Sequence, residues 1–263
     1  WIKRNGKEYN ISFKDGKVSS KLEVVDTVGQ RNTGTRLRFW PDPKFFDSDK
    51  FSVPQLKHTL KAKAVLSPGL KVTFKNEATG EKDEWFYSGD LGAYLVDELG
   101  KVEKLPAEPI ASRKEGDNEA VDYAIVWAPD AEQAFGESYV NLIPTTEGGT
   151  HVNGLRAGVA QAVRDFCEFR NLVPRGIKLT PEDIWDKASY VLSIKIHEPQ
   201  FAGQMKERLA SRVAAALVEK HGRDSMLLWL NRHPDAGEKI AQFAIANAQE
   251  RMKAAQKVVR KRI

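Results

Sequence analysis

The chain has 263 residues, of which 41% are apolar and 29% are charged, and this composition predicts a globular protein with one large domain or, as we prefer, two smaller ones. It contains no run of about eighteen apolar residues and no apolar leader after Trp1, which disfavours membrane insertion and secretion and predicts a cytoplasmic protein. The net charge of +5 permits contact with a polyanion, although many basic proteins bind no nucleic acid.

Signals for β-strands dominate the first 90 residues. Asn5-Gly6 and Asp15-Gly16 predict tight turns between strands, because such dipeptides accept the positive φ angles of hairpin loops. One helix, capped by Ser52, interrupts the strands. The predicted elements are strands at residues 1–2, 9–13 and 34–40, a helix at residues 52–66, and a hairpin of residues 71–74 and 85–87.

The composition changes near residues 88–90, and we place a domain boundary there, between residues 1–90 and residues 91–263. In the second part a strand, a helix and a strand follow one another, an order that predicts a right-handed crossover. The side chains of the last of these strands alternate, with Leu192 on one face and Val191 on the other. The predicted elements are a helix at residues 91–99, a proline-bearing connection at 105–109, strands at 121–127 and 137–143, a helix at 155–169, a strand at 190–196, and helical segments from residue 206 onward.

Residues 199–208 are the strongest candidate for chemistry. A loop with Gly203 leads to Gln204 and Lys206 at the start of a predicted helix, where backbone N–H groups favour anions. A lysine ammonium and a glutamine amide match the needs of a terminal phosphate. Taken on residue types alone, a solvated lysine at a helix start is the simpler interpretation.

Other polar patterns are weaker. Residues 33–35 stand at the start of the predicted strand, where the Thr35 hydroxyl can meet a nucleobase, although small polar residues at such a place usually form only a turn. The glycine pair at residues 148–149 is a turn without the spacing and lysine of a P-loop. The histidines, His151 included, show no metal-ligand spacing, and the single cysteine, Cys167, predicts a buried small hydrophobe with no disulfide. The basic residues at 257–262 favour a solvated helix face over a DNA site.

Three segments together point to a known family. The sequence YVNLIPTTEGGTH at residues 139–151 resembles the hallmark of the transducer domain in the ATPase subunits of bacterial type IIA DNA topoisomerases. Residues 34–41 are similar to the closing strand of their ATP-binding domain, and residues 204–206 occupy the place of the loop that reaches the γ-phosphate. The resemblance covers essentially the whole chain, and residues 164–171 and 194–204 are nearer to topoisomerase IV than to gyrase.

This resemblance implies an α+β chain: the C-terminal half of a GHKL α/β sandwich at residues 1–90, then a transducer of the ribosomal-S5 domain 2-like fold at residues 91–263, ending in a long helix. It implies ATP and Mg²⁺ as cofactors. In the family, two ATPase (B) subunits clamp shut when ATP binds, pass double-stranded DNA through a break made with the DNA-cleaving (A) subunits, and reopen after hydrolysis. The implied partners are therefore DNA, the A subunit of topoisomerase IV, and a second copy of the ATPase subunit within a heterotetramer, with no membrane.

Individual roles follow from the same resemblance. Lys206 would be the catalytic residue that stabilises charge on the γ-phosphate, and Gln204 would donate a hydrogen bond to that phosphate. Thr35 and Leu37 would line the adenine pocket. A loop that is held by triphosphate and released by diphosphate binds the two states with different affinity, which is what a domain rotation requires.

The chain departs from the family pattern in two ways. Met205 stands where the family has a threonine, and we expect a small effect because the flanking glutamine and lysine make the phosphate contacts. The family's water-activating glutamate, magnesium-binding asparagine and glycine-rich lid precede the position of Trp1. We therefore expect these residues alone to be inactive and the full-length protein to hydrolyse ATP.

Two other classes of function stay open from the sequence. The S5-like fold also serves RNA binding, so a basic, non-catalytic nucleic-acid-binding module is one alternative, and steep salt dependence of its affinity would distinguish it. The corresponding region of the gyrase B subunit is another. A mismatch-repair or chaperone ATPase of the GHKL class is disfavoured by the wording of residues 139–151.

Overall fold

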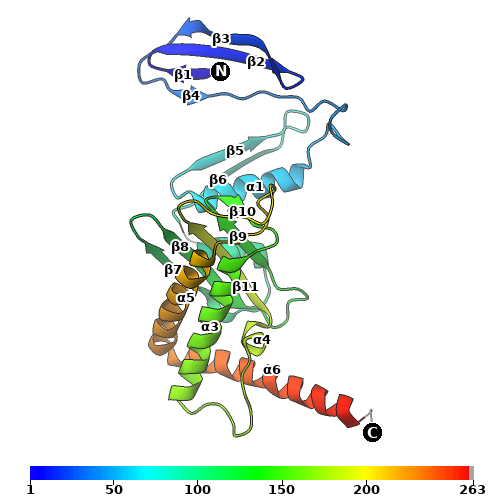
Figure 1. Cartoon of the computed structure of the whole chain (residues 1–263), viewed down its shortest axis with the longest axis vertical. Helices are drawn as coiled ribbons and strands as arrows, with labels where there is room; N and C mark the ends of the chain where they lie inside the picture. The colour runs from blue at the N-terminus through cyan, green and yellow to red at the C-terminus, as the bar shows by residue number, and fades with distance from the viewer. Residues whose placement is uncertain (90, 261–263) are drawn as a thin grey trace. The chain divides into compact units, whose positions relative to one another are not determined.

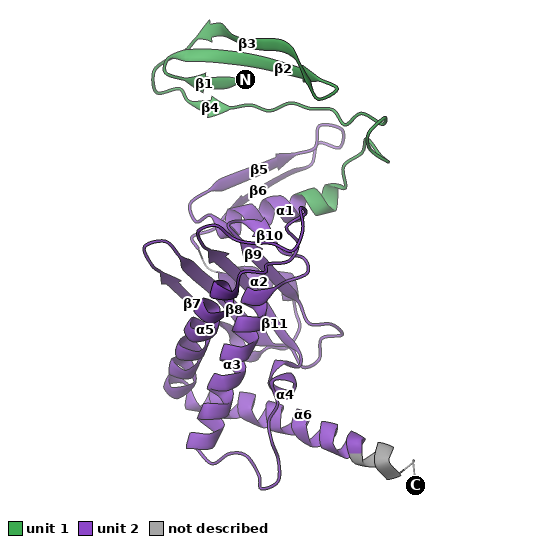
Figure 2. Ribbon diagram, viewed as in Figure 1, with its two compact units in different colours: residues 1–56 green, residues 57–263 purple. Residues whose placement is uncertain are grey.

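The computed structural model describes the backbone of residues 1–89 and 91–260 and the side chains as far as residue 255 (Figure 1). The chain divides into two compact units, residues 1–56 and residues 57–263, shown in green and purple in Figure 2. Each unit is described by itself below. The domain boundary predicted near residues 88–90 concerns the two domains that the resemblance implies, and it stays a prediction.

Unit 1 is an antiparallel sheet with strand order β3-β2-β1-β4. Its turns are the predicted ones: Asn5 and Gly6 have φ angles of 52° and 75°, and Asp15 and Gly16 have φ angles of 50° and 73°. The strands are β1 (Ile2–Arg4), β2 (Lys7–Lys14), β3 (Lys17–Thr27) and β4 (Gly34–Thr35). The two turns therefore connect β1, β2 and β3, whereas β4 reaches β1 through the longer connection after Thr27.

The predicted strand at residues 34–40 is wrong beyond its first two residues. Among the described strands β4 pairs only with β1, and a further backbone hydrogen bond on this edge runs from Arg36 N to Trp1 O at 2.8 Å. Because no described strand borders residues 37–40, these residues have no ladder to join, and 82% of Leu37 is exposed.

No hydrophobic side chain in the described residues of unit 1 is buried, which sets it apart from unit 2. Cross-strand neighbours share a face of the sheet, and the register aligns Thr35 with Ile2, Ile2 with Tyr9, and Tyr9 with Val24. The sheet therefore presents apolar side chains to its surroundings.

Unit 2 contains α1 (Val53–Leu66), which begins in unit 1, the hairpin of β5 (Lys71–Lys75) and β6 (Lys82–Phe86), and α2 (Leu91–Leu99). All four were predicted, and α1, β5 and α2 have nearly the predicted bounds, whereas the strand predicted at residues 85–87 begins three residues earlier, at Lys82. In α1 the buried residues gather at the C-terminal end and include Ala62, Val65 and Leu66, which pack in one cluster with α2.

The main sheet of unit 2 has five strands in the order β10-β9-β11-β8-β7. β11 and β9 run parallel and are connected through α3, which confirms the predicted crossover between parallel strands. The strands are β7 (Leu105–Glu115), β8 (Ala120–Trp127), β9 (Gly136–Val140), β10 (Ile143–Pro144) and β11 (Ala188–Lys195), and α3 is Thr150–Phe169.

Two strand predictions in this sheet need correction. The stretch at residues 105–109 was predicted as a connection because of its prolines, yet it begins β7. A register irregularity between Leu105 and Ile110 on this edge strand accommodates them. The strand predicted at residues 137–143 is broken at Asn141 and Leu142, whose positive φ angles of 49° and 67° turn the chain from β9 into β10.

Helices cover both faces of the sheet. Leu192 and Ile194 of β11 pack with α3, α5 (Arg212–Arg232) and α6 (Pro234–Arg260), whereas Val191 packs with α1 and α2, so the predicted alternation is confirmed. Figure 1 shows α3 and α5 side by side. Their axes approach closely at Gly154 and Gly158, where an added Cβ would lie 2.4 Å from a carbonyl oxygen of α5.

The remaining predictions concern the single cysteine, the basic residues near the C-terminus and membrane-spanning helices. Cys167 is buried as expected, and burial raises the pKa of its thiol to about 11. The side chains of the basic residues at 257–262 lie outside the described residues. Among those described, no helix is long and apolar enough to span a membrane.

Candidate functional site

The loop between β11 and α5 carries Gln204 and Lys206, and its conformation differs from the predicted one. The helix expected from Lys206 begins only at Arg212. Gly203 has a φ angle of 111° and Lys206 one of 60°, and a helix cannot pass through such residues. Lys206 therefore belongs to an irregular loop that precedes α5, and it does not lie in the first turn of that helix.

Leu209 anchors the C-terminal end of this loop. Its N–H donates to the carbonyl of Gly148 at 3.0 Å, and its carbonyl accepts from the N–H of Thr150 at 3.0 Å. On its other side Leu209 forms an antiparallel bridge with Phe201, so the loop folds back on itself before α5. Only 1% of Leu209 is exposed, and the anchor is part of the hydrophobic core.

Gly149 makes this anchor possible. It has a φ angle of 134°, and a Cβ at this position would lie 2.3 Å from the carbonyl oxygen of Leu209. Such a distance is far inside van der Waals contact, so only glycine permits the approach. The glycine pair at residues 148–149 thus holds the loop of Lys206 in place, a role that its sequence pattern did not reveal.

The centre of the loop is open to solvent. Gln204, Met205 and Lys206 are all exposed, with 79% of Met205 accessible. The Lys206 ammonium lies 5.8 Å from the ring centroid of Phe201, a cation–π distance, and forms no ion pair with any described residue. An unneutralised ammonium and an amide two residues apart can bind an anion.

Thr35 and Leu37, the predicted adenine contacts, lie in unit 1. Thr35 is an exposed residue of β4 on the row that includes Ile2 and Tyr9. An open pocket of about 330 Å³ is lined by Ile2, Arg4, Asn5, Tyr9 and Leu22. Thr35 therefore shares its row of the sheet with an apolar concavity, whereas Leu37 extends beyond the strand. Gln204 and Lys206 form a second pair in unit 2.

A buried polar cluster that was not predicted lies within residues 138–151, the segment that contains Gly149. The imidazole of His151 is fully buried, and its Nε2 lies 3.1 Å from the hydroxyl of Thr145, which lies 2.6 Å from the hydroxyl of Ser138. Burial lowers the pKa of His151 to about 4. The neutral ring at the start of α3 is thus linked through Thr145, the residue after β10, to Ser138 of β9, and no spacing in the sequence signals these partners.

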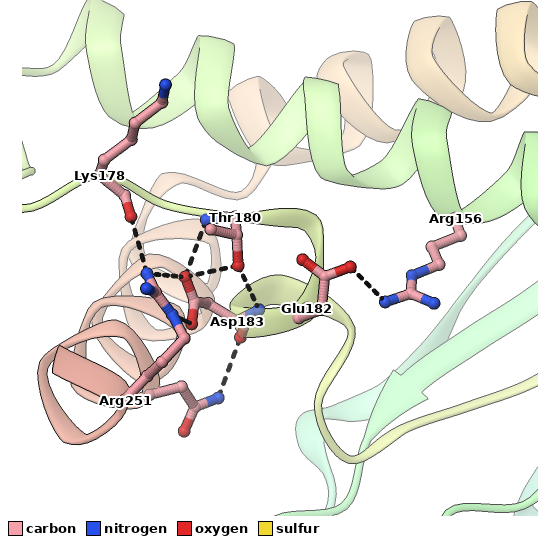
Figure 3. Close-up of polar contacts among 7 residues, drawn as sticks. Arg156, Lys178, Thr180, Glu182, Asp183 and Arg251 are labelled. Atoms are coloured by element: carbon pink, nitrogen blue, oxygen red, sulfur yellow. Dashed lines mark hydrogen bonds and ion pairs between the residues drawn. The ribbon is translucent and has the colours of Figure 1, made fainter. Parts of the chain in front are cut away.

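A second unpredicted cluster fixes α6 to α4 (Pro181–Trp185), as Figure 3 shows. The guanidinium of Arg251 donates to the buried carboxylate of Asp183 through Nε at 2.8 Å, and Thr180 donates to it through N at 2.8 Å. Burial opposes ionisation of Asp183, but these donors outweigh it and lower its pKa. The cluster is structural and lies apart from the loop of Lys206.

The sequence model of the DNA gyrase B family matches residues 91–259. The chain belongs to the DNA gyrase B family. The B subunit of DNA topoisomerase 4 from Pseudomonas aeruginosa is 55% identical over 262 residues, which is 100% of this chain and 42% of that protein. The chain thus spans about two fifths of the length of this curated relative.

Solved structures agree with the α+β fold class. The topoisomerase IV ATP-binding domain of Francisella tularensis, in complex with a small-molecule inhibitor, superposes with a TM-score of 0.82 and 38% identity, covering 95% of this chain and 68% of that one. The 43K ATPase domain of Thermus thermophilus gyrase B, in complex with an aminocoumarin, superposes with a TM-score of 0.76 and 26% sequence identity. The match covers 100% of this chain and 70% of that one. The higher identity to topoisomerase IV agrees with the predicted nearness to that member of the family.

Proposed function

We propose that this chain is part of the ATPase region of the topoisomerase IV B subunit, in which ATP binding and hydrolysis are coupled to DNA strand passage, relaxation and decatenation. The observation that carries the proposal is the exposed ammonium of Lys206, which forms no ion pair with any residue that the structure describes and lies at the centre of a loop whose end is anchored in the core. The 55% identity to the B subunit of a DNA topoisomerase 4 over the whole chain supports it.

The roles of four residues follow. Lys206 stabilises negative charge on the terminal phosphate of ATP, and Gln204 donates a hydrogen bond to the same phosphate. Thr35 and Leu37 contact the adenine. The residues fit such a ligand because no carboxylate among the described side chains neutralises the Lys206 ammonium, and because Thr35 shares a row of the sheet with Ile2 and Tyr9 of the open pocket.

The proposed cofactors and partners extend beyond these residues. ATP supplies the terminal phosphoanhydride bond that is hydrolysed, with Mg²⁺ as the counter-ion of the phosphates, and we assign no Mg²⁺ ligand among the residues described. The partners are double-stranded DNA, the A subunit of topoisomerase IV, and a second copy of the ATPase subunit in a heterotetramer, in the cytoplasm. We also propose that residues 1–90 belong to the ATP-binding domain and residues 91–263 to the transducer; the family match over residues 91–259 supports this division.

The test compares Lys206→Ala and Lys220→Ala in the full-length protein, assembled with the A subunit of topoisomerase IV on DNA. Lys220 is an exposed lysine of α5, remote in sequence from the loop, and serves as the matched control. We expect Lys206→Ala to lower ATP turnover and decatenation by at least about a hundredfold, since loss of one preorganised charge costs roughly 3 kcal/mol. Lys220→Ala should retain both activities. Unchanged turnover in Lys206→Ala would remove this lysine from the site.

A further inference from the structure

The turn between β9 and β10 has an unusual conformation. Asn141 and Leu142 both have positive φ angles, 49° and 67°. Asparagine adopts this region readily, but a leucine there is strained and persists only where its surroundings hold it. Contacts on two opposite sides of the turn supply that constraint.

On one side the turn is held by α1. The ammonium of Lys63 donates a hydrogen bond to the carbonyl of Leu142, and burial lowers the pKa of Lys63. α1 is itself fixed to α2 by an ion pair between Lys61 and Glu98 at 2.7 Å. The turn is therefore a fixed point of unit 2, although Asn141 itself is exposed.

On the other side the turn holds the end of β11. The N–H of Asn141 donates to the carbonyl of Ile194 at 2.9 Å. Beyond the last residue of the strand, the side-chain amide takes over: Oδ1 of Asn141 accepts from the N–H of Ile196 at 3.0 Å, and Nδ2 donates to the carbonyl of Ile196 at 2.9 Å. The amide thus replaces a strand partner for the first residue of the loop.

We propose that Asn141 is a positioning residue for the loop that carries Gln204 and Lys206. The amide of Asn141 holds the loop where it leaves β11, and Gly149 holds it at Leu209, so residues 139–151 fix both ends. The contribution to nucleotide binding rests on the proposed function, whereas the positioning itself does not.

The variant Asn141→Gly separates this role from turn formation. Glycine keeps the positive φ angle and the backbone hydrogen bond to Ile194, and it removes only the amide that holds Ile196. Asn171→Gly is the matched control. Asn171 also has a positive φ angle, 54°, and follows α3 at a distance in sequence from the loop.

The first measurement is amide hydrogen exchange on this chain without nucleotide. In Asn141→Gly we expect the N–H groups of Ala202 and Ala210, which bond across the loop to Arg208 and Gln200, to exchange about tenfold faster. Exchange in β8 should not change. Asn171→Gly should leave the loop at its normal rate. Unchanged loop exchange in Asn141→Gly, or equal acceleration in β8, overturns the proposal.

The second measurement is steady-state ATP hydrolysis by the full-length protein, assembled with the A subunit of topoisomerase IV on DNA. Without the amide of Asn141 the loop occupies more positions when no nucleotide is bound, which weakens the apparent binding of ATP. Saturating ATP still orders the loop, so we expect KM for ATP to rise about threefold with kcat unchanged. A fall in kcat at constant KM contradicts positioning. If no form hydrolyses ATP while loop exchange still responds to Asn141→Gly, the proposed function fails and the positioning role stands.

Discussion

Replacing Gly149 with alanine tests the anchor of the loop directly. The new Cβ would lie 2.3 Å from the oxygen, 2.5 Å from the nitrogen and 2.9 Å from the Cα of Leu209, all of them backbone atoms. To reach an ordinary van der Waals distance, the two segments must move apart by roughly 1 Å, because carbon contacts are most favourable at about 3.5 Å or more. That movement breaks the hydrogen bonds from Leu209 to Gly148 and from Thr150 to Leu209, each 3.0 Å long.

The energetic cost follows from these losses. Two backbone hydrogen bonds contribute about 1 kcal/mol each, and an alanine at a φ angle of 134° adds about 1–3 kcal/mol of strain. Gly149→Ala should therefore lower the free energy of unfolding by about 3–5 kcal/mol. Gly148→Ala is the matched control: its φ angle is 64° and its Cβ would meet Val152 at 3.4 Å, so its cost is about 1–2 kcal/mol.

Urea unfolding of this chain measures the difference. The midpoint should fall much further in Gly149→Ala than in Gly148→Ala, and the slope of free energy against urea should stay the same if both variants keep the fold. Equal costs for the two glycines would refute the reasoning, since only one of them faces the backbone of Leu209. A cost below about 1.5 kcal/mol for Gly149→Ala would show that the loop can move away at little expense.

Two further predictions concern the buried clusters. The pKa of His151 is about 4 in the folded chain and about 6.5 when unfolded, so the unfolded state binds the extra proton between these values and stability falls as pH drops through that window, by up to about 3 kcal/mol. Urea unfolding at pH 7 and 4.5 should show that stability changes less between these pH values in His151→Leu than in the parent chain. An equal change in the two chains contradicts the role of His151. Asp183→Asn should cost about 2 kcal/mol by weakening the contact to Arg251. In thermal unfolding Glu182→Gln, which alters an exposed pair, should differ from the parent by less than about 0.5 kcal/mol, and equal shifts for the two variants would contradict the role of Asp183.

The parts of the fold that the sequence predicted are those set by neighbours in the chain. Asn5-Gly6 and Asp15-Gly16 specify their turns by backbone preference, and the helix at residues 91–99 has the predicted bounds. β11 was predicted because successive side chains point to opposite faces of the sheet: Leu192 and Ile194 are apolar on one face, and the polar Ser193 and Lys195 lie on the other. Each of these signals lies within a few residues of the structure that it specifies.

The errors arose where a distant partner decides. Residues 37–40 have an alternating pattern but no neighbouring strand among the described residues, and residues 105–109 contain prolines but lie on a sheet edge, where a missing N–H is tolerated. Lys206 begins a run with helical composition, yet the backbone of Gly149 holds the adjoining segment in an extended bridge, and α5 begins only at Arg212. Propensity within the window could not reveal any of these partners.

The candidate site shows the same limit more sharply. Resemblance identified Gln204 and Lys206, but the residues that determine where they lie, Asn141 and Gly149, are 55 and 60 positions from their partners Ile196 and Leu209. Main-chain and amide hydrogen bonds hold both ends of the loop, so a displacement at its centre cannot be accommodated by moving the whole loop as one piece. Movement of the Lys206 ammonium toward an anion must therefore either stay within the few residues around Gly203 or carry the segment at residues 139–151, and with it the start of α3. This second possibility gives the loop a physical means of acting on the rest of unit 2.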